Sequence, residues 1–376
     1  MGSKIVTGKG NSVKAGIVGC GNICDIYFKA GKTFPILEIV ACADLVKERA
    51  KAKAREHGIP KSLSVDKLMA DAEIELVINL TVPAVHGEVA LQALQSGKHV
   101  YNEKPLCATR EEAVHMLKYA KERNLRIGCA PDTFLGASLQ TCRKIIDEGW
   151  IGNPVAVTAF MMHHGHETWH PDPEFYYKPG GGPMFDMGPY YLTALINFFG
   201  PIAKASAMTR TTFPERIVTS NERFGQRVKV ETPTHLACTL TFTNSVIATL
   251  ITSFDVWGHR LPHMEIYGTE GTLQVPDPNN FSGTIQYQRR GEGEWREVPL
   301  LFGYSENSRG VGTADLAHSL RSGRAHRANG DMAFHVLDVM HAFLDSAERA
   351  RHITIHSTCE RPQALPLALD EGELDP

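Results

Sequence analysis

Short, almost continuous apolar runs in the first eighty residues constrain the fold of this chain more than any other feature. They are Val13–Val18, Leu37–Ala43 and Glu75–Leu80, and none alternates with polar residues as a half-exposed strand does. Such runs are typical of parallel strands that are covered on both faces. Further short strands are expected at Lys98–Tyr101 and Arg126–Cys129. Segments with helical spacing separate these strands, at Leu45–Glu56, Val85–Gln95 and Arg110–Glu122. This alternation predicts a doubly wound α/β fold with a parallel sheet.

The pattern changes after about residue 132. A helix at Gly136–Asp147 and a strand at Pro154–Met162 are followed, between residues 201 and 300, by successive β-rich runs with turns at Thr243–Ser245 and Thr269–Gly271. Two helices are expected near 311–322 and 331–350. Strands without intervening helices favour a mostly antiparallel, open sheet in an α+β domain. At 376 residues the chain is long enough for two cores. We therefore expect two domains, 1–132 and 133–376.

Charge and cysteine usage narrow the class of protein. The net charge of −3 argues against a nucleic-acid partner, and no apolar run is long enough to span a membrane. The first twelve residues are polar and lack the apolar stretch of a secretory signal. Eight scattered cysteines form no C-x-x-C pair, which favours reduced, buried thiols. These features predict a cytoplasmic protein with neither a nucleic-acid nor a membrane partner.

A glycine-rich turn directly after the first strand predicts a dinucleotide site. Gly19 permits a tight turn, Gly21 lets a pyrophosphate approach the backbone, and Cys24 is a small residue where a third glycine or alanine is usual. Asn22 and Ile23 lead into the next helix, whose N-terminus favours phosphate. Asp44, at the end of the second strand, suits ribose hydroxyls and repels a 2′-phosphate. The expected cofactor is NAD rather than NADP.

The sequence Glu103-Lys104-Pro105 follows the fifth predicted strand. Ligands of doubly wound sheets bind beyond the carboxyl ends of the strands, so these side chains are expected to face the cofactor. Proline restricts the backbone of the residue before it, which would orient Lys104. On position alone, Lys104 could equally be a surface lysine in a loop.

Several segments together resemble the Gfo/Idh/MocA oxidoreductase family over about residues 13–350. They are GIVGCGNI, ACAD, TVPAVH, GKHVYNEKP and GGGPMFDMGPYY, in that order. The resemblance implies an N-terminal Rossmann domain and a C-terminal α+β domain with a large open sheet, through which a homodimer or homotetramer would form. It implies that Glu103 contacts the nicotinamide ribose and Lys104 the reacting oxygen. Thr81, Pro83 and His86 would line the cofactor.

The second domain supplies the expected substrate groups. Asp186 and Tyr190 lie four residues apart on a helix that begins near Gly180-Gly181-Gly182-Pro183, so they share one face. Many family members carry histidine where this chain has Tyr190. A histidine-rich loop precedes this helix, and its His163, His166 and Trp169 are expected to bind substrate. The loop lacks the spacing of a zinc site, so no metal is expected. Phe134 and Trp257 could stack on a sugar or simply pack in a core.

The favoured function is an NAD-dependent dehydrogenase that moves a hydride between nicotinamide and a secondary hydroxyl of a sugar or glycoside, including carbon 3. Lys104, Asp186 and Tyr190 would be catalytic, with Tyr190 exchanging the proton and Lys104 stabilising the alkoxide, or with these two roles reversed. Three alternatives remain open. They are a redox-neutral enzyme that cleaves glycosides through a 3-keto intermediate, an inositol dehydrogenase, and a non-catalytic NAD-binding regulator.

Overall fold

The computed structural model describes residues 12–220 and 223–375. The chain divides into two compact units. The first comprises residues up to Leu135, Phe302–Phe334 and residues from Leu365 onward, and the second comprises Gly136–Leu301 and His335–Ala364. Residues from the last fifth of the chain therefore complete the unit that the first third begins.

The first unit contains a six-stranded parallel sheet with the order β3-β2-β1-β4-β5-β6. Its strands are β1 (Val13–Val18), β2 (Leu37–Ala43), β3 (Lys61–Leu63), β4 (Leu76–Asn79), β5 (His99–Asn102) and β6 (Ile127–Cys129). The apolar runs of β1, β2 and β4 are almost entirely buried, as parallel strands require. The predicted doubly wound sheet is confirmed.

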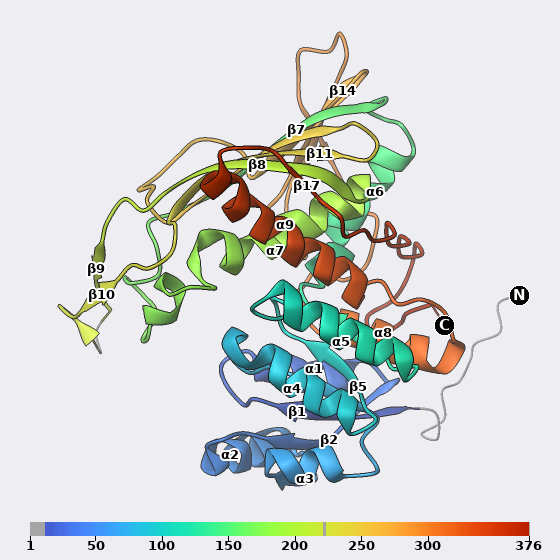
Figure 1. Ribbon diagram of the computed structural model, residues 1–376. Helices are drawn as coiled ribbons and strands as arrows, with labels where there is room; N and C mark the ends of the chain where they lie inside the picture. Colours follow the sequence, from blue (N-terminus) through green and yellow to red (C-terminus); the bar gives the residue numbers. More distant parts are fainter. Residues whose placement is uncertain (1–11, 221–222, 376) are drawn as a thin grey trace, which may run out of the picture. The chain divides into compact units, whose positions relative to one another are not determined.

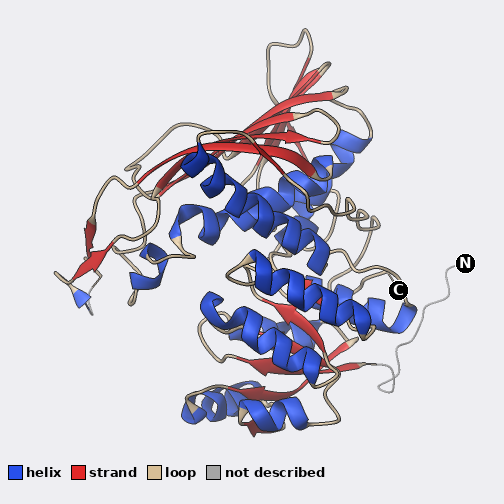
Figure 2. Ribbon diagram, viewed as in Figure 1, coloured by secondary structure: helices blue, strands red, loops and turns tan. Residues whose placement is uncertain are grey.

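Helices connect these strands (Figures 1 and 2). They are α1 (Cys24–Thr33), α2 (Lys47–His57), α3 (Val65–Ala70), α4 (His86–Gln95) after the short η1 (Pro83–Val85), and α5 (Arg110–Glu122), with η2 (Thr133–Leu135) after β6. The start of α5 is fixed by a capping box, in which Thr109 accepts from the Glu112 amide and Glu112 accepts from the Thr109 amide. The strand order reverses between β1 and β4, and the loops after these two strands form the switch point where such folds bind ligands.

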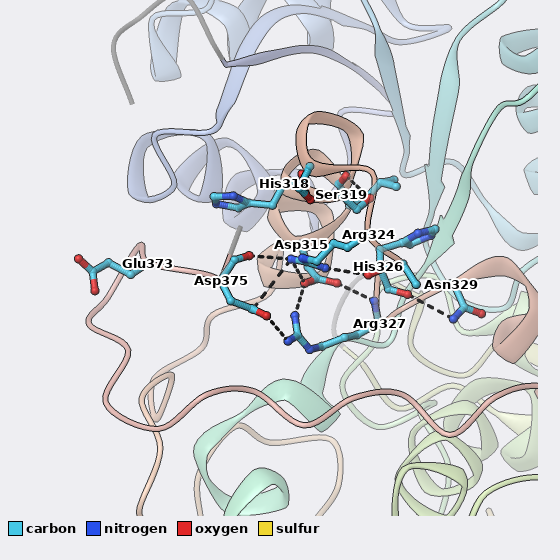
Figure 3. A network of polar contacts seen from close by, with 12 residues as sticks. Asp315, His318, Ser319, Arg324, His326, Arg327, Asn329, Glu373 and Asp375 are labelled. Carbon is cyan, nitrogen blue, oxygen red and sulfur yellow. Dashed lines mark hydrogen bonds and ion pairs between the residues drawn. The ribbon is translucent and has the colours of Figure 1, made fainter. Parts of the chain in front are cut away.

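The C-terminal segments are tied to the first unit by a network of charges (Figure 3). Helix α8 (Val311–Ser322) carries Asp315, which is fully buried and paired with Arg327 at 2.6 Å and Arg324 at 2.8 Å. Arg327 also donates to Asp375 at 2.7 Å. Because Asp315 is buried beside two guanidinium groups, its charge is compensated, and the chain's end is held against α8.

The second unit is built on a nine-stranded sheet with the order β16-β15-β14-β13-β7-β12-β11-β8-β17. Only β7 and β12 pair in parallel, so the expected mostly antiparallel sheet is confirmed. Its strands are β7 (Pro154–Met162), β8 (Ile202–Arg210), β11 (His235–Phe242), β12 (Ile247–Ser253), β13 (Met264–Gly268), β14 (Gly271–Val275), β15 (Ile285–Arg289), β16 (Arg296–Val298) and β17 (Ile353–Thr354). A separate hairpin joins β9 (Glu215–Ile217) to β10 (Arg227–Lys229).

Helices cover one face of this sheet. They are α6 (Ala137–Asp147), α7 (Gly182–Phe199), which packs against β7, β11 and β12, and α9 (Gly330–Arg349), whose Ser346 accepts from the Ala207 amide of β8. Along β12, Ala248 and Leu250 are buried, whereas Ile247 is exposed and Ile251 is half-buried. The sheet therefore has one packed face and one open face.

The cysteines and helices agree with the sequence-based expectation. All eight cysteines are buried free thiols. Among the described residues, the helices are too short or too polar to cross a lipid bilayer.

Candidate active site

The glycine-rich turn after β1 has the geometry that a dinucleotide requires. Gly19 has a φ of +100°, and a Cβ at this position would lie 2.6 Å from the carbonyl oxygen of Leu80. A Cβ on Gly21 would have no protein atom within 4 Å. Gly19 is thus required by the fold itself, while Gly21 leaves open space above the backbone, as a pyrophosphate needs.

Asp44 connects this turn to the end of β2. Its Oδ2 accepts from the Cys20 amide at 2.8 Å, and its Oδ1 accepts from the Val46 amide at 2.8 Å. Each carboxylate oxygen has further acceptor capacity, which suits ribose hydroxyls. The Arg49 guanidinium lies 3.7 Å from Asp44. Asp44 therefore orders the glycine-rich turn, a role in addition to the one its position predicts.

The beginning of α1 is suited to an anion. Ile23 occupies the N-cap position without a side-chain cap, and Asn22 and Ile23 are both exposed. The amides of the first turn are thus not satisfied by a capping side chain, which is typical of phosphate-binding helices. Cys24 is fully buried at the first position of the helix, where a small side chain permits close packing. Together with Gly21 and Asp44, these groups fit a bound NAD.

Lys104 stands on a firmly held loop at the carboxyl end of β5. The Tyr27 hydroxyl donates to Glu103 Oε1 at 2.9 Å, and the Lys104 amide donates to Glu103 Oε2 at 2.9 Å. The peptide bond between Lys104 and Pro105 is cis. Lys104 is half-buried. Glu103 thus uses both carboxylate oxygens to hold this loop.

His86, which is expected beside the cofactor, is buried between two loops. It is 1% exposed, with Nδ1 2.7 Å from the Pro105 carbonyl oxygen and Nε2 2.9 Å from the Thr81 carbonyl oxygen. Burial lowers the pKa of His86. A neutral imidazole has a single N–H, so only one of these two carbonyls can accept a hydrogen bond from it. The ring joins the loop that contains Thr81 and Pro83 to the loop that contains Lys104.

Two asparagines that the sequence analysis did not single out complete this support. Asn79 ends β4 and Asn102 ends β5, and both are 0% exposed. Asn79 donates to Asn102 at 3.0 Å and accepts from the Thr81 hydroxyl at 2.7 Å, while Asn102 donates to the Leu106 carbonyl at 2.8 Å. The sequence feature that could have identified them is an asparagine at the end of each of two apolar strands. A buried side-chain amide needs hydrogen-bond partners, so such a residue indicates a polar network.

The second unit brings together several of the predicted substrate residues. Asp186 and Tyr190 lie on α7, which begins at Gly182 with Pro183 in its first turn, as predicted. His166 Nε2 lies 3.0 Å from Asp186 Oδ2, and both side chains are about nine-tenths buried. Tyr190 is 9% exposed, one helical turn after Asp186. Pro189 lies inside this helix, which continues to Phe199.

His163 lies beside this pair. Its ring centroid is 5.0 Å from that of His166, and its Nδ1 accepts from the Gly165 amide at 3.0 Å. Burial, with the neighbouring His166 as the next cause, lowers the pKa of His163 to about 4. The imidazole is therefore neutral near pH 7, with its proton on Nε2.

A buried cluster of charged side chains holds the histidine-rich loop in place. Glu167 follows His166 and accepts from Arg216 at 3.0 Å and from the Tyr177 hydroxyl. Arg216, 4% exposed, also pairs with Asp255. Two carboxylates thus neutralise one buried guanidinium, and the loop is anchored to β9 and to the end of β12.

The aromatic candidates differ in how far their side chains are exposed. Phe134 is 1% exposed and is packing, whereas Trp169 is 61% exposed and its ring lies 5.2 Å from that of His166. Trp257 is 82% exposed.

Within the described residues, one group of three potential metal ligands is close enough to share an ion: Asp25, Glu56 and His57. The Lys53 ammonium already lies 2.6 Å from Asp25 in this group, which lies in the first unit and outside the histidine-rich loop.

Comparison with known proteins identifies both parts of the chain. Residues 13–130 match the model of the oxidoreductase family with an NAD-binding Rossmann fold, GFO_IDH_MocA. Residues 139–274 match the GFO/IDH/MocA C-terminal domain. The two models cover the glycine-rich turn, the Lys104 loop, the histidine-rich loop and α7.

Individual relatives are distant. A 1,5-anhydro-D-fructose reductase from Ensifer adhaerens is 37% identical over 124 residues, which are 33% of this chain and 37% of the reductase. Levoglucosan dehydrogenase from Pseudarthrobacter phenanthrenivorans is 25% identical over 285 residues, which are 71% of this chain and 69% of the dehydrogenase. Several of the curated relatives are matched over only about half of their length.

Solved structures share the fold. An NAD binding oxidoreductase from Klebsiella pneumoniae superposes with a TM-score of 0.80 at 20% identity, covering 92% of this chain and 99% of that one. Levoglucosan dehydrogenase in complex with NADH and levoglucosan gives a TM-score of 0.79 at 20% identity, covering 92% and 100%. With a matching Rossmann unit, a matching C-terminal domain and this likeness of fold, the chain belongs to the Gfo/Idh/MocA family of oxidoreductases.

Proposed function

We propose that this protein is an NAD-dependent dehydrogenase that oxidises a secondary hydroxyl of a sugar or glycoside, at carbon 3 of the ring. The observation that carries the proposal is the way in which the loop of Lys104 is held. Its loop is held by Glu103, His86 and Asn102, which are themselves bonded to Tyr27, Thr81 and Leu106. A cation held in place before the substrate arrives stabilises a developing alkoxide without reorganisation.

Lys104 of the first unit and Asp186 and Tyr190 of the second would serve the same reaction. Gly21, Asp44 and the start of α1 would hold NAD, which would supply the hydride acceptor for the alcohol carbon. Tyr190 accepts the hydroxyl proton, Lys104 stabilises the negative charge on the oxygen, and Asp186 orients the hydroxyl. His166, bonded to Asp186, and His163 would bind neighbouring hydroxyls. A positioned acid–base group typically accelerates such a step about 100- to 10,000-fold.

A Tyr190→Phe variant separates the two assignments of the base. If Tyr190 exchanges the proton, the variant loses about 100-fold or more in kcat while it binds NADH with unchanged affinity. If Lys104 is the base and Tyr190 stabilises the alkoxide, Tyr190→Phe also lowers kcat, but the acidic limb of the pH–rate profile remains, whereas this limb disappears if Tyr190 is the base. Steady-state kinetics across pH, with NADH binding measured by fluorescence, decide between these results.

The proposal of a sugar or glycoside substrate rests on the chemistry of the site residues and on the relatives of this chain. The relatives include enzymes named for levoglucosan, for 1,5-anhydro-D-fructose and for scyllo-inositol. A panel of sugars, methyl glycosides and inositols, followed by NADH absorbance, tests the proposal. Reduction of NAD by a sugar or glycoside, with a 3-keto product by mass and NMR, supports it. Reduction only by inositols would make the protein an inositol dehydrogenase, and NAD binding without reduction would make it a regulator.

A second function, redox-neutral cleavage of glycosides, is favoured by one observation. His166 Nε2 lies 3.0 Å from Asp186 and its Nδ1 has no hydrogen-bond partner among the described residues, so this nitrogen could accept the proton on the carbon next to a transient 3-keto group. Loss of this proton would expel the substituent on carbon 1, water would then add, and reduction would restore the sugar. Release of phenol from an aryl glycoside with catalytic NAD and no net NADH would favour this route.

We propose further that the protein is a cytoplasmic homodimer or homotetramer that assembles through the open face of the nine-stranded sheet. The centre of this face carries uncharged side chains such as Thr158, Thr249 and Ile251, which are half-buried, and the exposed Met208. Uncharged side chains at the centre of an open sheet face are typical of an interface.

A further inference from the structure

Trp257 stands out among the aromatic residues because its surface is open. The indole is 82% exposed, on the loop that follows β12. Single exposed apolar residues are common, but an indole offers a much larger contact area than most side chains. An exposed Trp257 therefore favours binding of a partner more than an isolated surface leucine does.

The indole is held flat before any ligand binds. It stacks on His164 with ring centroids 3.3 Å apart and planes inclined by 14°. His164 is in turn fixed by Phe213, whose ring lies edge-on at 6.2 Å, and its Nε2 lies 3.5 Å from Arg216. We call Trp257, His164 and Phe213 the aromatic platform. Because its rings support one another, a ligand that stacks on it loses little additional side-chain entropy.

The aromatic platform is adjacent to the proposed substrate groups. His164 lies two residues before His166, so their Cα atoms are at most about 7 Å apart. His166 is the residue that bonds Asp186, and its own Nδ1 is buried without a partner among the described residues. The loop of Trp257 is also bonded to the histidine-rich loop, because the Val256 amide donates to the His163 carbonyl at 3.3 Å. The platform therefore lies on the same two loops as His163 and His166.

Charge favours a neutral ligand at the aromatic platform. Burial, with the nearby Arg216 cation as the next cause, lowers the pKa of His164 and keeps its ring uncharged. Arg216 itself is paired with Glu167 and Asp255, so its charge is compensated. The cation that lies beside His164 is therefore already paired with two carboxylates. A flat apolar group would gain stacking without losing charge solvation.

We propose that the aromatic platform is a subsite for the aromatic aglycone of a glycoside. The inference rests on the proposed sugar or glycoside specificity and extends it, because it makes an aryl glycoside a better ligand than the corresponding alkyl glycoside. The sugar ring would lie at His166 and Asp186, and the aryl group on carbon 1 would stack on Trp257.

Binding of two matched probes to the full chain with saturating NAD tests the proposal. The probes are p-nitrophenyl β-D-glucopyranoside and methyl β-D-glucopyranoside, and dissociation constants are measured by calorimetry. The wild-type chain is expected to bind the aryl probe roughly tenfold or more tightly, as stacking on an exposed aromatic ring usually does. In Trp257→Ala the ratio of the two constants falls toward one, and in Trp257→Phe most of it returns. Trp295→Ala, which removes another exposed tryptophan of the same unit, leaves the ratio unchanged.

Three results would overturn the proposal. They are an equal preference in wild type, a preference that survives Trp257→Ala, and a Trp257→Ala variant whose mass in light scattering falls, since the indole would then be covered by a second copy of the chain. Failure of the proposed function looks different. If neither probe yields NADH but the tryptophan-dependent preference in binding persists, the dehydrogenase proposal fails for glucosides and the aromatic platform stands.

Discussion

Most of the buried polar side chains near Lys104 bind backbone or one another. Asn79, His86 and Asn102 lie within hydrogen-bonding distance of carbonyl oxygens of the loops that follow β4 and β5. Glu103 accepts from the amide of Lys104 and from Tyr27. Such contacts fix the loop in one conformation, which is what a catalytic ammonium needs if it is to stabilise charge as the charge forms.

Removal of the Lys104 ammonium should abolish most of the activity and little of the stability. Lys104→Ala is expected to lower kcat by about 100-fold or more with sugar and NAD. The melting temperature and NADH affinity serve as controls, because the substitution leaves in place the contacts through which Glu103, His86 and Asn102 hold the loop. Near-normal turnover in this variant would contradict the assignment.

The two glycines of the turn after β1 should respond to the same substitution in different ways. In Gly19→Ala the new Cβ meets the Leu80 carbonyl at 2.6 Å and requires a positive φ, so the melting temperature should fall by several degrees. Gly21→Ala meets no protein atom within 4 Å and should fold normally, but it fills space that the pyrophosphate needs. Its NAD affinity should drop by tenfold or more in calorimetry. Equal melting temperatures for the two variants would refute this distinction.

At the scale of elements, one carboxylate holds the N-terminus of α8. Asp132 is 1% exposed and accepts from the amides of Gly310 at 2.8 Å and Gly312 at 3.0 Å. Burial raises the pKa of Asp132 from 3.8 to about 6, against the lowering effect of these two amides. The folded protein therefore releases this proton at a higher pH than the unfolded chain does.

Stability should reveal this carboxyl through its pH dependence. Because the folded pKa exceeds the unfolded one, the contribution of Asp132 is most favourable below pH 3.8 and is lost as the pH rises through 6. Relative to Asp132→Asn, the wild type should lose about 3 kcal/mol of unfolding free energy between these limits. Urea unfolding of both proteins at half-unit steps of pH measures this difference. A difference that does not vary with pH would show that Asp132 is not titrating.

The sequence predicted the long buried elements better than the short ones. The bounds of β1, β2, β7 and α5 agree with those predicted, because each element coincides with a β-rich run or with a segment of helical spacing. Strands β3, β9 and β10 have only three residues each, too few for a periodic signal. The same limit applies to the candidate site. Glycine spacing marked the turn after β1, whereas the cluster of Glu167, Arg216 and Asp255 joins residues that are far apart in the chain.

At the scale of the molecule, the open face of the nine-stranded sheet should decide the assembly. The helices α6, α7 and α9 pack on one face, and the other presents side chains of the central strands β7 and β12. A single sheet whose open face carries apolar and uncharged side chains at its centre is prone to associate. Cyclic dimers and tetramers are the common outcome for such a surface.

A charge at the centre of this face should dissociate the assembly. Ile251→Lys is expected to convert an oligomer into a smaller species, because each symmetric interface would bury the new ammonium twice. Val114→Lys, on the exposed face of α5 in the other unit, is the matched control and should leave the mass unchanged. Light scattering after size-exclusion chromatography reads both. A wild-type monomer, or an unchanged mass in Ile251→Lys, would exclude this face as the interface.

The network of Asp315, Arg327 and Asp375 has a consequence for biosynthesis. A ribosome releases β1 to β6 long before it has made Asp315, Arg327 and Asp375. Domains usually fold in the order in which they are translated. The Rossmann unit instead gains these ion pairs only after Gly136–Leu301 of the second unit have been made, so its assembly is completed later than that of a continuous domain.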